Sequence, residues 1–296
     1  MPRALSVRVG HIPETISAPQ APFTVGTQVG VPTGTSLTDR SSLGAQTGTE
    51  TISLTHPVTG AALSRPGSPV WRDIRFTQTL QPNPASGVTY WFDRCEFNSS
   101  AEFYVVDLID GNGTFDVMVP LAVFTDCTFD GNDSCNTALN GGFLWAVRCE
   151  IGHAENAHAG LYYTVLQDCN LVATTDGLAD PHSDGVQCAG IGESDIYHCW
   201  TDSGADPLSA TAAVRIGTEF SAVTDVGLYY TGFGGTQHGL QVRGDAGAGD
   251  VSALVVRGCR FAPTFVQGTV DFQQATVAEW TDNAFFDGTP ISNPVP

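Results

Sequence analysis

The chain has 296 residues and 42% hydrophobic content, which is enough for one sizeable folded body. Its 12 basic and 31 acidic residues give a formal net charge of −19. A surface this acidic repels the phosphate backbone, so we expect no nucleic-acid partner. The acidity fits either simple solubility or the binding of cations or neutral sugars.

The N-terminus and the hydropathy pattern predict a protein made in the cytosol without a signal peptide. Residues 1–8 contain no apolar core of a signal peptide, and no stretch approaches the roughly 20 apolar residues of a membrane span. Residues 1–68 lack any repeat and are rich in Gly, Thr, Ser and Pro. We predict that they form a cap, an attachment arm or an irregular first turn, and a cap is physically required because an uncapped solenoid exposes unpaired strand edges.

A repeat occupies residues 69–287. Its unit is an apolar residue, two mostly polar residues, a Cys or other small residue, a variable residue and usually a second apolar one. The fourth residues run from Ile74 to Asn283 with an average spacing of about 26, a period typical of solenoids. Two short strands meeting at a bend fit each copy, which predicts an all-β, single-stranded parallel β-helix of about nine rungs. The copies are 71–76, 92–97, 124–129, 146–151, 166–171, 196–201, 223–228, 256–261 and 280–285.

Six of the eight cysteines fall at the fourth position of this unit. In a stack with strands about 4.8 Å apart, Cys95, Cys127, Cys149 and Cys169 form one internal column of small side chains. We therefore predict buried thiols rather than disulfides. The sequence has no Cys-x-x-Cys pair, so we expect neither a metal site nor a cofactor.

A second strand recurs in the C-terminal half, at 186–188, 214–216, 240–242 and 270–272. Each copy places two apolar residues around a polar one, so the polar residues should form one solvent-facing column. With His238, this column is the predicted ligand-binding set: Gln187, Arg215, Gln241 and Asp271. Residues 288–296, with three prolines, are predicted to be a C-terminal tail.

Two segments carry a resemblance to a known group of proteins. Residues 29–38, VGVPTGTSLT, resemble the opening of right-handed parallel β-helix proteins of actinobacteria and their tailed phages. Residues 181–187, PHSDGVQ, are similar to a His-x-Asp-Gly-[Val/Ile]-Gln signature of the same group. The resemblance covers about residues 22–287 and implies a right-handed coil. The group includes minor tail proteins, tail spikes and carbohydrate-active proteins.

His182 and Asp184 are the candidate catalytic residues, because an imidazole next to carboxylates can act as a general base. They share parity with the inward Val186, so they face solvent only if the chain bends near Gly185. The structural alternative is a turn in which Asp184 bonds to backbone amides.

The enzyme hypothesis has further requirements. A glycosidase needs two carboxyl groups about 5 Å apart for retention or about 6.5–9.5 Å apart for inversion. Asp271 lies three rungs from Asp184, about 14 Å away, so the pair would come from Asp180 and Asp184 on one strand or from a neighbouring subunit. A lyase needs a base and a cation, for which His182 and either Arg215 or Arg243 are available.

Three functions remain open at this stage. The first is a structural tail component of a phage that recognises host cell-surface glycan, because envelope glycan enzymes usually carry an export signal whereas virion proteins are released by lysis. The second is a polysaccharide lyase or glycoside hydrolase, and the third is an architectural subunit without a ligand. The expected partners are other tail proteins and surface polysaccharide and, by analogy alone, two further copies in a homotrimer.

Overall fold

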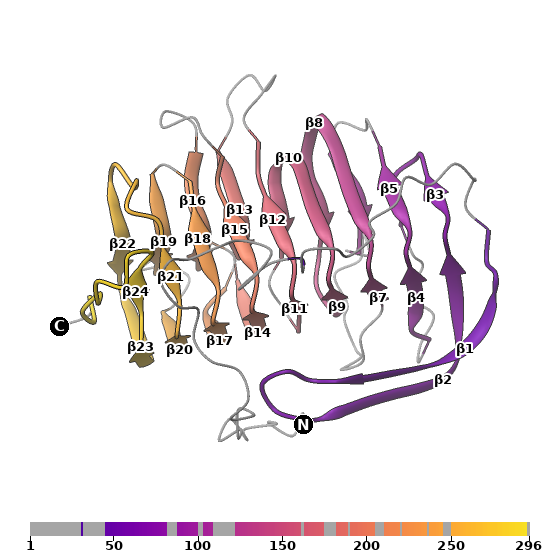
Figure 1. The fold of residues 1–296 in the computed structure, drawn as a ribbon, viewed down its shortest axis with the longest axis horizontal. Coiled ribbons are helices and arrows are strands. Elements are labelled where there is room, and N and C mark those ends of the chain that lie inside the picture. The colour runs from indigo at the N-terminus through magenta and orange to yellow at the C-terminus, as the bar shows by residue number, and fades with distance from the viewer. Residues whose placement is uncertain are drawn as a thin grey trace.

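The computed structural model is an all-β protein whose mostly parallel strands form curled sheets, consistent with a β-solenoid (Figure 1). The residues it describes are 31, 45–81, 88–99, 103–108, 122–160, 163–174, 182–188, 190–204, 210–219, 221–235, 237–244 and 250–294. Across these ranges the secondary structure contains no helix. Consequently nothing among them could cross a bilayer as a long apolar helix.

The first sheet has ten strands. Nine of them pair in parallel, one from each rung, and only β1 pairs antiparallel. Their spatial order is β1 (Gly48–Thr55), β2 (Ala62–Arg72), β4 (Tyr90–Asp93), β7 (Ala122–Thr125), β9 (Leu144–Val147), β11 (Val165–Gln167), β14 (Ile191–Tyr197), β17 (Val223–Tyr229), β20 (Val251–Arg257) and β23 (Ala275–Thr281).

The second sheet has fourteen strands and covers the other faces of the solenoid. The long strands β8 (Thr128–Asn140) and β10 (Glu150–Ala159) pair with strands of both faces and so join them. The other members are β3 (Arg75–Phe76), β5 (Glu96–Asn98), β6 (Tyr104–Asp107), β12 (Asn170–Val172), β13 (Ser183–Cys188), β15 (Trp200–Asp202), β16 (Ala210–Gly217), β18 (Gly232–Gly234), β19 (His238–Arg243), β21 (Arg260–Phe261), β22 (Gly268–Gln273) and β24 (Ala284–Phe285).

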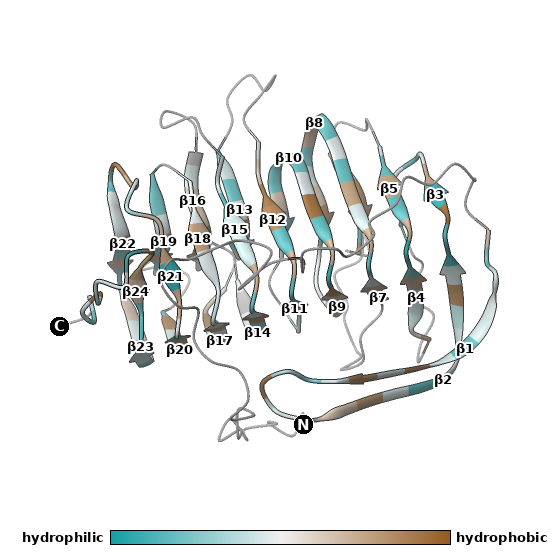
Figure 2. Ribbon diagram, viewed as in Figure 1, coloured by the Kyte–Doolittle hydropathy of each residue, from teal (hydrophilic) through white to brown (hydrophobic). Residues whose placement is uncertain are grey.

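Like side chains stack on like inside the solenoid. The rings of Phe92 and Phe124 lie 5.1 Å apart, and those of Phe97 and Phe129 lie 4.8 Å apart, close to the spacing of neighbouring strands. Hydrophilic and hydrophobic residues alternate along the strands, as Figure 2 shows. The core is therefore a set of columns that run the length of the molecule.

The predicted cysteine column is confirmed. The amide of Cys95 donates to Cys127 Sγ, and the amide of Cys169 donates to Cys199 Sγ, both at 3.4 Å. All eight cysteines are free and buried. Burial raises the pKa of the Cys259 thiol to about 12, so this side chain behaves as a small hydrophobe and not as a nucleophile.

Each rung turns at a residue with left-handed backbone geometry, one position before the cysteine column. The nine residues have φ between 50° and 66°, and only one is glycine. Aspartate, which tolerates this conformation better than most residues, occupies four of the nine positions. The corner residues are Asp73, Arg94, Asp126, Arg148, Asp168, His198, Tyr230, Gly258 and Asp282.

The seventh copy of the repeat was predicted in the wrong register. The structure pairs Ile196 with Leu228 and Trp200 with Gly232, so the copy is 228–233 and not 223–228. The error came from Asp225, which stands in the sequence pattern where the corner aspartates do but lies within β17, where it also has φ 56°. The true fourth position is Thr231, whose hydroxyl donates to Tyr229 O at 3.1 Å.

A hairpin of β1 and β2 forms a cap and a strap. β1 lies antiparallel beside β2, which belongs to the first rung, and the register shifts between Glu50 and Ile52. Beyond this shift the hairpin runs along the outside of the ten-stranded sheet, where Ile52 packs with Trp145 (Figure 1). At its tip, His56 Nε2 lies 3.3 Å from Asp195 Oδ2. The hairpin thus covers apolar side chains that would otherwise face water.

The cysteine column predicts how substitutions at Cys149 affect stability. Cys149→Leu adds methylene groups to a closely packed column and should lower the free energy of unfolding by about 1–3 kcal/mol. Cys149→Thr should cost less, because threonine already occupies this column at position 231. Urea denaturation of both variants is the measurement. Equal losses would contradict a column selected for side-chain size.

Candidate functional site

The predicted polar column lies on four neighbouring strands in one register. Gln187 pairs with Arg215, Arg215 with Gln241, and Gln241 with Asp271. Parallel strands lie about 4.8 Å apart, so the column presents one polar side chain per rung along the wall of the solenoid. The alignment of these four residues follows the sequence prediction.

The column is not solvent-facing throughout. Gln187 and Asp271 are half-buried, and the Arg215 side chain is 22% exposed, but Gln241 is only 2% exposed. Asp271 Oδ2 accepts hydrogen bonds from Arg243 at 3.1 Å and from Gln241 Nε2 at 3.5 Å. These contacts hold Arg243 and Gln241 against Asp271, and Gln241 is buried. The prediction that Gln241 faces solvent was therefore wrong.

Arg215 lies between two carboxylates. Its guanidinium donates to Glu219 Oε1 at 2.5 Å, and it approaches Asp184 Oδ2 at 4.0 Å. Glu219 and Glu155 both act on the Asp184 carboxyl electrostatically. One cation is therefore shared in a group with more acids than bases.

Asp184 is fully buried and engaged by backbone. Its Oδ1 accepts the amide of Ala212 at 3.0 Å, and its own amide donates to Asn156 Oδ1 at 3.2 Å. Asn156 and Ala212 occupy the same position in the rungs on either side. The alternative to a catalytic role was a structural turn in which Asp184 bonds to backbone amides. The hydrogen bond from the amide of Ala212 is a contact of this type.

The other predicted site residues have surroundings that differ from those of Asp184. His182 is exposed, its amide donates to Glu155 Oε1 at 3.0 Å, and no hydrogen bond joins it to Asp184 in the described structure. His238 is only 5% exposed, and its Nδ1 lies 3.2 Å from Gly268 O. Asp180 lies outside the described residues. The structure therefore presents His182 to solvent but not Asp184 or His238.

Burial controls the charge of Asp184. Removal from water raises the pKa of this carboxyl well above its usual range, and the Arg215 guanidinium opposes the shift only partly. A carboxyl with a raised pKa can hold a proton at neutral pH, which is the property of a general acid. Its full burial leaves it without direct contact with a ligand.

His158 is a buried titratable residue that the sequence did not reveal. It lies in the column of Leu139 and Val186, its Nδ1 donates to Leu139 O at 2.8 Å, and its Nε2 has no hydrogen-bond partner in the part of the chain that the structure describes. Burial lowers its pKa to about 4. Only the alignment of β10 with β13, which the repeat did not provide, could have indicated its position.

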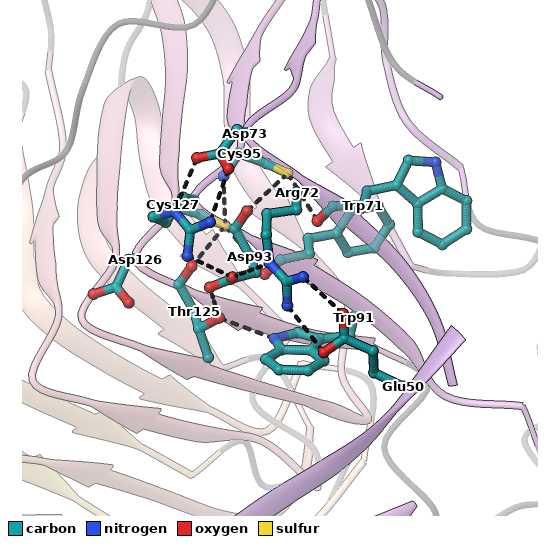
Figure 3. A network of polar contacts seen from close by, with 12 residues as sticks. Glu50, Trp71, Arg72, Asp73, Trp91, Asp93, Cys95, Thr125, Asp126 and Cys127 are labelled. Carbon is teal, nitrogen blue, oxygen red and sulfur yellow. Dashed lines mark hydrogen bonds and ion pairs between the residues drawn. The ribbon is translucent and has the colours of Figure 1, made fainter. Parts of the chain in front are cut away.

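A polar network beside the hairpin is structural. Arg72 donates to Glu50 of the hairpin and to Asp93 of the second rung, and Asp93 also accepts from Thr125 and Arg94 (Figure 3). The contacts of Arg72 with Glu50 and Asp93, and of Asp93 with Thr125, join neighbouring strands. The contact of Arg94 with Asp93 joins adjacent residues. The network therefore holds the hairpin against the first three rungs.

Metal chemistry has no visible site in the described structure. Across the described ranges, no group of three or more His, Cys, Asp or Glu side chains is arranged to hold a metal ion. The corner acids are used in pairs instead: Asp126 with Arg148 at 2.7 Å and Asp168 with His198 at 2.6 Å.

Asp184→Asn is predicted to stabilise the protein at neutral pH. Burial raises the pKa of the folded carboxyl, whereas the unfolded one ionises above about pH 4, so the contribution of Asp184 to stability falls as pH rises from about 4 toward the raised folded pKa. Asparagine keeps the acceptor for Ala212 and cannot ionise. We expect a gain of about 1 kcal/mol at neutral pH that shrinks toward about pH 4, measured by thermal melts. Asp282→Asn, at an exposed corner, is the control and should show no such gain.

His158 predicts the opposite dependence. Its folded pKa of about 4 lies below the unfolded value of about 6.5, so only the unfolded chain takes up a proton between these limits. The stability that neutral His158 contributes is present above about pH 6.5 and declines by about 3 kcal/mol as pH falls to about 4. His158→Leu should remove this slope in urea denaturation. A slope that persists in the variant would assign the dependence to other groups.

Comparisons with known proteins give little similarity. No protein family and no curated protein matches the sequence. A solved structure, the ORF18 protein of Geobacillus virus E2, aligns with 78% of this chain at 8% identity and a TM-score of 0.39. The chain spans 56% of the length of that protein.

Proposed function

We propose that this protein is a structural component of a phage tail, of the minor tail protein or tail spike type, whose side wall recognises a host cell-surface glycan. The observation that carries the proposal is the polar column on β13, β16, β19 and β22. It offers amide, guanidinium and carboxylate groups at the strand spacing on a backbone fixed by strand pairing, which is two-sided for β13, β16 and β19 and one-sided for β22. A virion context rests on the resemblance of residues 29–38 and 181–187.

The charge of the chain selects the kind of glycan. With a formal net charge of −19, the protein repels polyanions such as polyuronates. Gln187 and Arg215 are partly exposed and can hydrogen-bond sugar hydroxyls, which carry no charge. We therefore favour a neutral, hydroxyl-rich polysaccharide.

The second candidate is a polysaccharide lyase or glycoside hydrolase that uses His182 and Asp184. The raised pKa of Asp184 and the nearby Glu219 favour it, because an acid and a carboxylate together are what a glycosidase requires. This candidate also requires a movement that uncovers Asp184, which is fully buried. We place it second for that reason.

The finer organisation is part of the proposal. We infer a right-handed coil, because crossover connections between parallel strands are right-handed in about 98% of cases. We assign residues 1–68 to an arm that docks to other tail proteins, 69–287 to the solenoid, and 288–296 to a tail. Assembly as a homotrimer in the virion is proposed by analogy.

Glycan binding by the purified full chain tests the proposal. We expect titration calorimetry with a panel of neutral and uronate-containing actinobacterial polysaccharides to show binding of a neutral member. Gln187→Ala should weaken it about fivefold, because one direct hydrogen bond is lost. Gln167→Ala, a half-buried glutamine on β11 of the other sheet, is the matched control and should bind normally.

Turnover of the same panel separates the two candidates. Reducing ends and unsaturated-uronate absorbance should not increase in our proposal. Product formation that Asp184→Asn abolishes would establish the enzyme instead. Absence of binding to every polysaccharide would refute glycan recognition by the side wall.

A further inference from the structure

The last rung of the solenoid has two strands whose outer edges carry no partner in the described structure. β22 and β23 are each the final strand of their sheet. Both lie at the end of the molecule near the C-terminus (Figure 1). A free parallel edge presents unpaired N–H and C=O groups, which favour the addition of another strand.

Apolar side chains are uncovered at this end. Leu240, Val242 and Val256 are fully buried in the rung before the last. The residues that continue their columns, Val270, Phe272 and Trp280, are only partly buried. The change occurs within one strand spacing, so among the described residues the core is open in cross-section and no layer of polar residues closes it.

The C-terminal residues close only one side of the rung. The amide of Ile291 donates to Asn283 O at 2.9 Å, and the indole of Trp280 donates to Ile291 O at 3.0 Å. Ala284 of β24 forms an antiparallel bridge with Pro290. These contacts cover β24 and the indole of Trp280 near the end of β23, and they leave the backbone edges of β22 and β23 without a partner strand in the described structure.

The opposite end of the solenoid is treated differently. There the antiparallel strand β1 pairs with β2 along the outer edge of the first rung. Glu50 of β1 is fixed by Arg72 of β2. One end therefore has a built cap in the ten-stranded sheet, and the other has none among the residues described.

Charge at the open end is of one sign. Residues 261–294 contain Asp271, Glu279, Asp282 and Asp287 and no Arg, Lys or His. Arg243 and Arg257 of the preceding rung pair with Asp271 and Glu279, whereas Asp282 and Asp287 are exposed at the end. A partner that meets this end is favoured if its rim is basic.

We propose that the open end formed by β22 and β23 is a docking surface for a β-strand segment of another protein with a basic rim. The added strand continues the parallel stack, and its side chains cover Phe272 and Val277. A second copy fits less well. Two open ends facing each other bring only acids of residues 261–294 together, and a copy placed head to tail meets β1, which runs antiparallel to β2 and so does not continue the parallel stack. This inference goes beyond glycan recognition and does not depend on it.

Synthetic peptides test the docking surface on the full chain. The probes are a short alternating Thr-Val peptide flanked by lysines and the same peptide flanked by glutamates. We expect fluorescence anisotropy to show binding of the lysine peptide only. Hydrogen exchange should show new protection in β22 and β23, because their edge amides gain partners.

Three variants locate the binding. Val277→Glu on the open end should weaken the lysine peptide about tenfold, because it puts a charge into the covered surface. Val172→Glu, at an exposed valine on the side wall, is the matched control and should bind as the parent does. The double variant Asp282→Asn with Asp287→Asn keeps the backbone contacts and should weaken the salt-dependent part of binding. Thermal melts confirm that each variant is folded.

Several outcomes would overturn the proposal. Binding of neither peptide, or binding that Val277→Glu leaves unchanged, would show that the open end does not accept a strand. Self-association in sedimentation velocity that Val277→Glu abolishes would identify a second copy as the occupant. In glycan titrations these variants should bind glycan as the parent does. A failure of the docking-surface proposal can therefore be distinguished from a failure of the proposal that the side wall binds glycan.

Discussion

The structure depends on in-register stacking of parallel strands. Every residue of a rung must fit the residues directly above and below it, at a distance fixed by backbone hydrogen bonds. Apolar side chains satisfy this rule by repetition, as in the stacked rings of Phe92 and Phe124 and the column of thiols from Cys95 to Cys199. The repeat in the sequence is a consequence of this requirement.

Charged residues meet the same rule differently, because like charges one strand apart repel. Along the corner, acids and bases alternate over the first rungs: Asp73 pairs with Arg94, Asp126 with Arg148, and Asp168 with His198. On the side wall, Arg215 stands between two glutamines. Polar columns therefore contain ion pairs and neutral amides, whereas apolar columns repeat the same type of residue.

The features that recur in every rung could be predicted from the sequence. The all-β class, the thiol column and the register of Gln187 with Arg215 are periodic, so they could be predicted without a structure. The strap was not predictable, because the contact of His56 with Asp195 joins segments with no shared pattern. The seventh copy failed because residues 223–228 also match the repeat unit, with Asp225 at the position of the corner aspartates. Burial of Gln241 depends on Arg243 and Asp271, which the alternation of inward and outward residues does not describe.

Stacking also limits where chemistry can occur on such a wall. A ligand with a repeating structure can use one column at several rungs, because the spacing is the same at each. A catalytic group must differ from its neighbours in the column, and Asp184, between Asn156 and Ala212, is such a position. There the neighbouring strands supply an amide to the carboxylate and an asparagine to its backbone, and the side chain is fully buried. The contacts that accommodate an acid in the stack are thus the ones that separate it from a ligand, which favours recognition over catalysis for this wall.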